Sequence, residues 1–213
     1  MKKKQQRDFD TVAASWDEKP LRQALAEAVA QGIAADIPLS ASMAALEYGC
    51  GTGLCGLRLA PAIGHLTAVD TSAGMLTELQ KKLSALKLGN VTPRQISAER
   101  WELPEQAFDL IFASMVLHHI ANTGELLERL KGSLKPGGFL ALADLEPEDG
   151  SFHDDPSGVS HQGFDPQQLL IQLQQLGFVA LKAHTVHRIP KQRDGEERPY
   201  PVFLLTGQLP GRE

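Results

Sequence analysis

Glycines alternate with other residues in LEYGCGTGLCG, which spans residues 46–56. An apolar run over residues 43–48 predicts a buried strand before these glycines, and residues 54–59 predict the start of a helix after them. Without a Cβ, glycine lets the backbone turn sharply and approach a ligand closely. The unpaired N–H groups of the following helix can hold an anionic or polar group. The sequence therefore predicts a ligand-binding loop between strand and helix.

Asp70 directly follows the next predicted strand, residues 66–69, about 20 residues beyond the glycines. A carboxylate at this place can accept hydrogen bonds from both hydroxyls of a ribose, which favours a nucleotide-like ligand. Residues 51–56 also satisfy the G-x-G-x-x-G pattern, so an NAD(P)-dependent oxidoreductase is one hypothesis. After the fifth predicted strand, however, about 70 residues follow, fewer than a second nucleotide-binding half or a substrate domain normally needs.

Short apolar runs alternate with amphipathic segments along the chain, as in folds where strands alternate with helices. The pattern predicts an α/β fold with a Rossmann-like, doubly wound, mostly parallel sheet of seven strands. The last two strands have no helix between them, so we expect an antiparallel edge strand. Strands are predicted over residues 43–48, 66–69, 91–96, 109–115, 139–145, 178–186 and 200–206, and helices over residues 21–33, 54–59, 73–86, 122–134 and 166–176.

The composition is that of one globular domain whose core needs no disulfide or structural metal. The 213 residues are 42% hydrophobic and carry a formal net charge of -5. An acidic chain argues against a nucleic-acid partner, because such binding needs a basic surface. No apolar run reaches about 18 residues, so we expect no membrane span. The N-terminal sequence lacks an apolar signal core, and we expect a cytoplasmic location. The oligomeric state stays open.

The order of several motifs from about residue 9 to residue 206 resembles that of class I S-adenosylmethionine-dependent methyltransferases of the small-molecule, type 11/12-like kind. Glu47-x-Gly49-x-Gly51-x-Gly53 resembles the first motif of that family. The resemblance implies S-adenosylmethionine as cofactor and S-adenosylhomocysteine as product. It also implies a methyltransferase domain over residues 41–213, with residues 1–40 as an N-terminal arm and helix that can act as a lid. The other matching segments are residues 69–72 with Met75, 108–111, 117–120, 134–139 and 176–178.

The resemblance also implies which residues bind the cofactor. The glycines would admit its methionine part, Asp70 its ribose, and the segment after Asp70 its adenine. Where the family often has an Asp-Ala pair after the third strand, this chain has Ser97-Ala98. The candidate cofactor-binding residues are Glu47, Gly49, Cys50, Gly51, Gly53, Asp70, Thr71, Met75, Ser97, Ala98 and Ser114.

His118 and His119 follow the fourth predicted strand, where the family has residues that face the transferred methyl group. Imidazole titrates near neutral pH, so either histidine is a candidate general base. The alternative is structural, because paired histidines can also cap a turn or line a pocket. Asp144, near the end of the fifth predicted strand, is a candidate substrate contact whose alternative is to order a loop.

A polar stretch over residues 146–163 is too long for a routine connection, so we predict a lid. Its His153 and His161, and Trp16 of the N-terminal arm, are candidate substrate contacts. The spacing of the histidines and acidic residues in this stretch matches no compact metal motif, so we expect no metal. We expect a small-molecule methyl acceptor, whereas a non-catalytic cofactor-binding protein is the third hypothesis.

Overall fold

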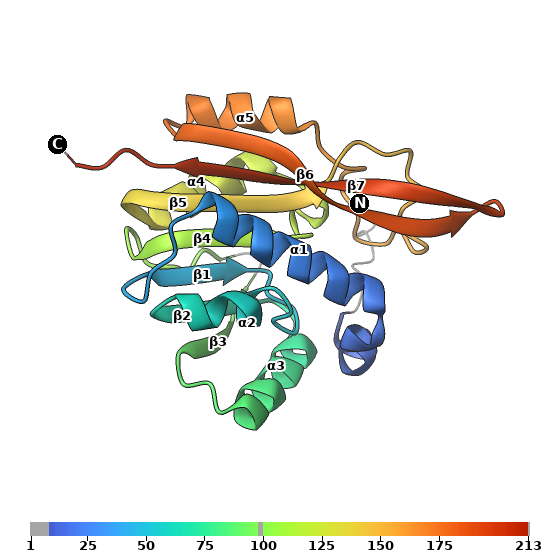
Figure 1. Ribbon diagram of the computed structural model, residues 1–213, viewed down its shortest axis with the longest axis horizontal. Helices are drawn as coiled ribbons and strands as arrows, with labels where there is room; N and C mark the ends of the chain where they lie inside the picture. The colour runs from blue at the N-terminus through green and yellow to red at the C-terminus, as the bar shows by residue number, and fades with distance from the viewer. Residues whose placement is uncertain (1–8, 98–99, 213) are drawn as a thin grey trace.

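The computed structural model describes residues 9–97 and 100–212, which form a seven-stranded sheet in the order β3-β2-β1-β4-β5-β7-β6 (Figure 1). β1 to β5 are parallel, and β7 runs antiparallel to both β5 and β6. The predicted Rossmann-like α/β fold, with antiparallel pairing at one side, is thereby confirmed. The strands are β1 (Ala44–Tyr48), β2 (His65–Asp70), β3 (Val91–Gln95), β4 (Phe108–Ser114), β5 (Leu134–Leu145), β6 (Val179–Arg193) and β7 (Glu196–Gln208).

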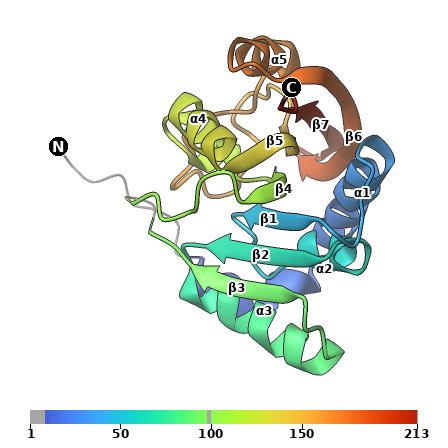
Figure 2. The same ribbon diagram turned by 90° about the vertical axis from the view of Figure 1, so that its left-hand side faces the viewer.

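Helices cover both faces of the sheet (Figure 2). α1 (Pro20–Asp36), α2 (Gly56–Leu59) and α3 (Ala73–Leu86) pack on one face. α4 (Thr123–Ser133) and α5 (Pro166–Gln175) pack on the other. Successive strand residues point to opposite faces, so a strand buried on both sides is apolar throughout. Short 3-10 helices complete the list of elements: η1 (Asp10–Glu18), η2 (Ala60–Ala62) and η3 (Leu117–His119).

Local sequence signals explain where the helices begin and end. α3 covers the predicted range residue for residue, because the Ser72 hydroxyl accepts a hydrogen bond from Met75 N at 3.1 Å and caps the helix. Asp165 caps α5 in the same way, with Pro166 at the first helical position. α2 begins only at Gly56, later than predicted, because the glycine loop extends into the expected helix.

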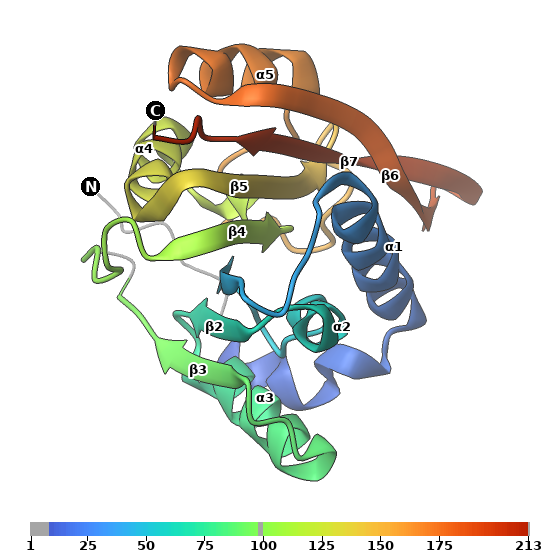
Figure 3. The same ribbon diagram turned by 60° about the vertical axis from the view of Figure 1, so that its left-hand side comes forward.

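The last two strands are much longer than predicted, because they form one hairpin that extends beyond β4 and β5 (Figure 3). Its turn is Asp194-Gly195, and both residues have a positive φ, 53° and 84°. Such a turn matches the twist of the flanking strands. β5 also starts earlier than predicted, at Leu134 rather than residue 139, with a register shift opposite β4.

The carboxyl ends of β1 to β5 meet at one edge of the sheet, the edge at which α/β folds bind ligands. At this edge, on the right of Figure 1, lie η1, the start of α1, the outer part of the β6–β7 hairpin and the loop of residues 146–163. We call that loop the lid loop. None of the helices in the described ranges is long and apolar enough to cross a membrane.

Candidate functional site

The glycine loop begins where β1 ends, at the place in the sheet where the strand order reverses. Gly49, Gly51 and Gly53 have φ angles of 71°, 53° and 77°, a region that favours glycine. A Cβ on Gly49 would lie 2.4 Å from Val116 Cγ2, so this glycine lets the loop press against the segment after β4. A Cβ on Gly51 would meet only Met75 Sδ, at 3.9 Å. Gly51 therefore leaves room for a ligand.

Asp70 lies beside this room and fixes the loop. Its Oδ2 accepts a hydrogen bond from Gly51 N at 2.7 Å, and its Oδ1 accepts one from Ser72 N at 2.9 Å. Burial raises the pKa of this carboxyl, against the lowering effect of the backbone donors. Each carboxylate oxygen can accept a further hydrogen bond, so Asp70 can hold the loop and bind ligand hydroxyls together. The residues present therefore fit a ribose-containing cofactor.

Glu47 lies underneath the loop, with 3% of its surface exposed. Its Oε1 accepts a hydrogen bond from Gly56 N at 3.2 Å, whereas Oε2 is buried and has no hydrogen-bond partner among the described residues. Burial is the main cause that raises its pKa to about 8. Cys50 is also buried, and desolvation raises the pKa of its thiol. These residues support the loop from within the fold.

η1, which is part of the N-terminal arm, binds to the edge of the sheet at which the carboxyl ends of the parallel strands meet. Asp10 Oδ1 accepts hydrogen bonds from the Ser72 hydroxyl at 2.5 Å and from Gly74 N at 2.7 Å, at the start of α3. Asp17 accepts one from the Thr52 hydroxyl at 2.6 Å, within the glycine loop, and pairs with Lys82. The arm is therefore bound to the loop as well as to α3. No sequence motif indicated these contacts.

His118 and Asp144 form a buried pair after β4 and at the end of β5. His118 Nδ1 lies 2.7 Å from Asp144 Oδ1, and the two residues are 2% and 0% exposed. Two backbone N–H groups, those of His118 and Leu145, also donate to this carboxylate. Asp144 is thus an acceptor throughout, which assigns the proton to Nδ1 and leaves Nε2 as the basic nitrogen.

Further rings surround this pair. His119 lies 4.1 Å and His153 4.9 Å from His118, measured between ring centroids. Phe9 of the arm packs edge-on against His119 at 5.3 Å and against Trp16 at 5.9 Å. Of the predicted substrate contacts, His153 therefore packs on His118, and Trp16 is connected to His119 through Phe9. Neither motif nor spacing predicted this arrangement.

The lid loop is fastened at both ends. Its second half binds the turn after β4: Ser160 N and His161 N donate to His118 O, and His161 Nε2 lies 2.9 Å from Ile120 O. Its first half binds the β6–β7 hairpin, where Arg193 donates to Ser151 O and Phe152 O. His118 is consequently covered by the loop.

The other predicted site residues lie as follows. Ser114 is the last residue of β4. The next residue, Met115, has a φ of 59°, which is unusual for a bulky side chain. Residues with such strained backbone angles are concentrated at active sites and ligand-binding sites. Thr71 and Ser97 are exposed at the ends of β2 and β3, and Met75 is buried against the glycine loop. Ala98 lies outside the described residues.

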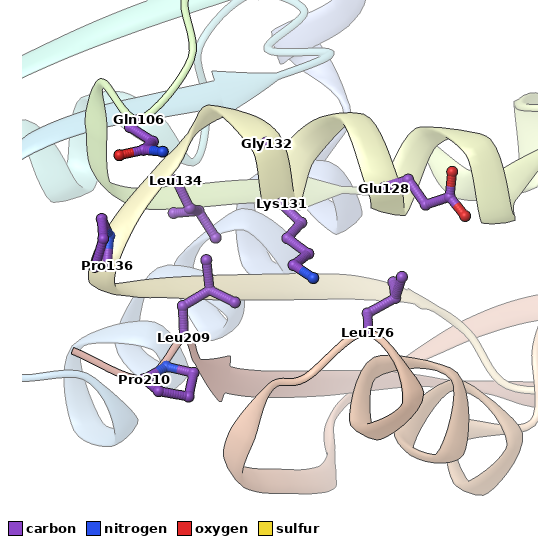
Figure 4. A pocket seen from close by; sticks show the side chains of 9 residues that line it. All are labelled: Gln106, Glu128, Lys131, Gly132, Leu134, Pro136, Leu176, Leu209 and Pro210. Atoms are coloured by element: carbon purple, nitrogen blue, oxygen red, sulfur yellow. The ribbon is translucent and has the colours of Figure 1, made fainter. Parts of the chain in front are cut away.

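One cavity lies away from these residues. It measures about 560 Å³ and is formed by the end of α4, the start of β5 and Leu209-Pro210, at the opposite edge of the sheet (Figure 4). A second cavity of about 460 Å³ lies in the lid loop, with His153 and His161 in its wall. Within the described ranges, no histidines, cysteines and acidic residues group so as to hold a metal ion.

The family model for a methyltransferase domain matches residues 45–138, from β1 to the start of β5. An uncharacterized methyltransferase of Mycobacterium tuberculosis is 38% identical over 108 residues, which are 50% of this chain and 52% of that protein. Trans-aconitate 2-methyltransferase of Methylobacterium radiotolerans is 36% identical over 110 residues, 51% of this chain and 40% of that protein. The chain thus spans about half the length of the first curated relatives that it matches.

Solved structures share the fold across most of the chain. A SAM-dependent methyltransferase of Aquifex aeolicus superposes with a TM-score of 0.69 and 21% identity, over 94% of this chain and 98% of that one. Phosphoethanolamine N-methyltransferase 2 of Haemonchus contortus, in complex with S-adenosylmethionine, gives a TM-score of 0.70 and 15% identity, over 96% and 60%. Together with the glycine loop and its acidic partner, the match to the methyltransferase-domain model over residues 45–138, the relatives named as methyltransferases and the shared fold support a class I S-adenosylmethionine-dependent methyltransferase.

Proposed function

We propose that this protein transfers a methyl group from S-adenosylmethionine to a small-molecule acceptor. The observation that carries the proposal is the juxtaposition of two sites at one sheet edge. The glycine loop, tied to Asp70, packs through Gly49 against Val116, two residues before His118. Cofactor-binding and proton-accepting groups thus lie on neighbouring strands, as transfer between two bound molecules requires.

The cofactor residues follow from this geometry. Gly51 leaves space at the loop, Asp70 offers its remaining acceptor positions to ribose hydroxyls, and Met75 closes the adenine side. Glu47 and Cys50 act from below by holding the loop. S-adenosylmethionine supplies a sulfonium methyl group that an acceptor nucleophile can attack. The task of the protein is to align that acceptor, exclude water and accept its proton.

His118 is the proposed general base, and Asp144 the residue that positions it. Asp144 holds Nδ1, so Nε2 is the nitrogen that takes a proton from the acceptor. Because His118 is only 2% exposed, access of the acceptor requires the lid loop to move. His119, half-buried with Nδ1 bonded to Gly158 O, lines the same place. This assignment turns Asp144 from a substrate contact into a partner of His118.

The acceptor class rests on two supports. The net charge of -5 is unfavourable for binding a nucleic acid. A relative is named for methylation of trans-aconitate, which is a small carboxylic acid. A nicotinamide-dependent oxidoreductase lacks comparable support, since the matching proteins named above are methyltransferases.

The test is label transfer. The protein is incubated with methyl-labelled S-adenosylmethionine and the small-molecule fraction of a cell extract, and parallel samples contain RNA or protein instead. We expect label in the small-molecule fraction, and a rate lowered about 100-fold in His118→Asn, the size of a lost general base. His65→Asn, at an exposed position on β2, is the control.

Melting curves and S-adenosylhomocysteine binding show whether His118→Asn stays folded. If the wild type binds cofactor but labels nothing, the protein is a non-catalytic binder and the proposal is wrong. Full turnover of a folded His118→Asn variant would refute the base assignment alone.

A further inference from the structure

We propose that the acceptor is an anion, with a carboxylate or phosphate group that binds a patch of cations beside the lid loop; this inference rests on the proposed methyl transfer. The cationic patch consists of Lys19 and Arg22 at the start of α1 and Lys191 and Arg193 at the outer end of β6. These residues lie about 170 positions apart in sequence, and no motif connects them.

The packing of α1 along β6 creates the patch. A Cβ on Gly32 would lie 2.9 Å from Val186 Cγ2 and 2.8 Å from Leu204 Cδ2, so this glycine lets the helix lie directly on the hairpin. Near the end of α1, Asp36 pairs with Lys182 at 3.3 Å. The start of the helix therefore reaches the far part of β6, where Lys191 and Arg193 lie.

The positive charge of Lys19, Lys191 and Arg193 is only partly compensated within the residues that the structure describes. Arg193 pairs with Asp154 of the lid loop at 2.7 Å. The ammonium groups of Lys19 and Lys191 form no ion pair with a carboxylate in the parts of the chain that the structure describes. Burial lowers the pKa of Lys191, and the nearby Arg193, Lys19 and Arg22 lower it further, against the opposite effect of Asp154. A bound anion would relieve this repulsion.

Contacts connect both halves of the patch with His118 and His119. On the hairpin side, Lys191 Nζ donates to Phe152 O and lies 4.2 Å from the centroid of the Phe152 ring, which packs against His153. His153 in turn packs on His118.

On the arm side, the Arg22 guanidinium lies 3.4 Å from the centre of the Trp16 ring, and Phe9 connects Trp16 to His119. An acceptor with its anionic end in the patch would thus extend past aromatic side chains toward the proposed base.

A small anion suits this arrangement better than a polyanion. The chain as a whole is acidic, so the patch is a local concentration of positive charge that attracts an oppositely charged ligand to one edge of the sheet. Guanidinium and ammonium groups bind carboxylates and phosphates through charge-assisted hydrogen bonds.

Calorimetry with a charged and an uncharged probe tests the patch. The full chain is titrated with citrate and with trimethyl citrate, which keeps the carbon skeleton without the charges, in the presence and in the absence of S-adenosylhomocysteine. We expect citrate to bind and the triester not to bind. In Lys19→Gln/Lys191→Gln the citrate affinity should fall at least about tenfold. The control Lys81→Gln/Lys131→Gln loses the same charge in α3 and α4, away from the patch.

Equal binding of the triester, wild-type affinity in the patch variant or no binding of citrate would overturn the inference. Gln at position 191 keeps a donor for Phe152 O, and melting curves check that the variants fold. S-adenosylhomocysteine binding is read separately. If it fails in every protein, the proposed function is wrong, whereas the citrate titrations still decide whether the patch binds anions.

Discussion

Glu47 shows how a single residue can make the glycine loop sensitive to pH. Its carboxyl group is buried under the loop, and one of its oxygens has no hydrogen-bond partner in the part of the chain that the structure describes. The family resemblance indicated that Glu47 belongs to the site, but not that it lies beneath the loop. Whether a residue of the motif faces the ligand or the core depends on how the strand packs. The spacing of the motif carries no information about that packing. The same is true of Asp144, whose contact with His118 joins β5 to η3, the turn after β4.

The pKa of Glu47 predicts a pH dependence of stability. It is about 8 in the folded protein, against an ordinary value of 4.5. Between these values the unfolded chain loses the proton that the folded protein keeps. This contribution to stability is therefore fully present below pH 4.5 and is lost as the pH rises through about 8. Its size is about 5 kcal/mol at most.

Urea unfolding from pH 5 to pH 9 measures this effect. We expect the free energy of unfolding to fall with pH more steeply in the wild type than in Glu47→Gln, which has no proton to lose. Glu128→Gln, at an exposed position on α4, controls for the change in net charge. The same slope in wild type and Glu47→Gln would show that Glu47 is not protonated in the folded protein.

Among the helices and strands, the β6–β7 hairpin is the element that the sequence predicted least well. The last pair of strands was expected, but its outer part was missed because polar and charged residues dominate there. Asp194-Gly195 is nevertheless a strong hairpin signal, which favours strands that continue up to this turn on both sides. α3 and α5, by contrast, carry capping residues in the sequence, and their beginnings were predicted correctly. Local signals thus predicted the helices, whereas the contacts of the hairpin with the lid loop depend on the fold.

Arg193 is predicted to control the mobility of the lid loop. It donates three hydrogen bonds to the loop, to Ser151 O, Phe152 O and Asp154. In Arg193→Gln we expect deuterium uptake in residues 149–161 to become about tenfold faster, because the opening free energy of this segment falls by roughly 1.4 kcal/mol. Arg188→Gln, an exposed position on the same strand, is the control. Unchanged exchange in the loop, or equal acceleration throughout the sheet, would contradict this role.

For the whole molecule, the strand order brings the separate segments to one edge. The alternation of strands and helices predicted the sheet and therefore the edge at which a ligand binds. Three side-chain contacts join segments that lie 26 to 42 residues apart in the sequence: Asp17 with Thr52, Arg193 with the lid loop, and Asp144 with His118. Such pairs leave no periodic signal in a single sequence. The site was thus predictable where motifs follow the strands, and not where distant side chains meet.

Thermal unfolding in the presence of S-adenosylhomocysteine, the product form of the cofactor, tests whether the glycine loop binds S-adenosylmethionine. At about 100 times its dissociation constant, S-adenosylhomocysteine should stabilise the protein by roughly 2.7 kcal/mol and raise the melting temperature by roughly 5–10 °C. NADH should cause no shift. Gly51→Val, which fills the space at the loop, should abolish the shift, whereas Gly132→Ala, in open space on α4, should keep it. Stabilisation by NADH but not by S-adenosylhomocysteine would contradict this function of the loop.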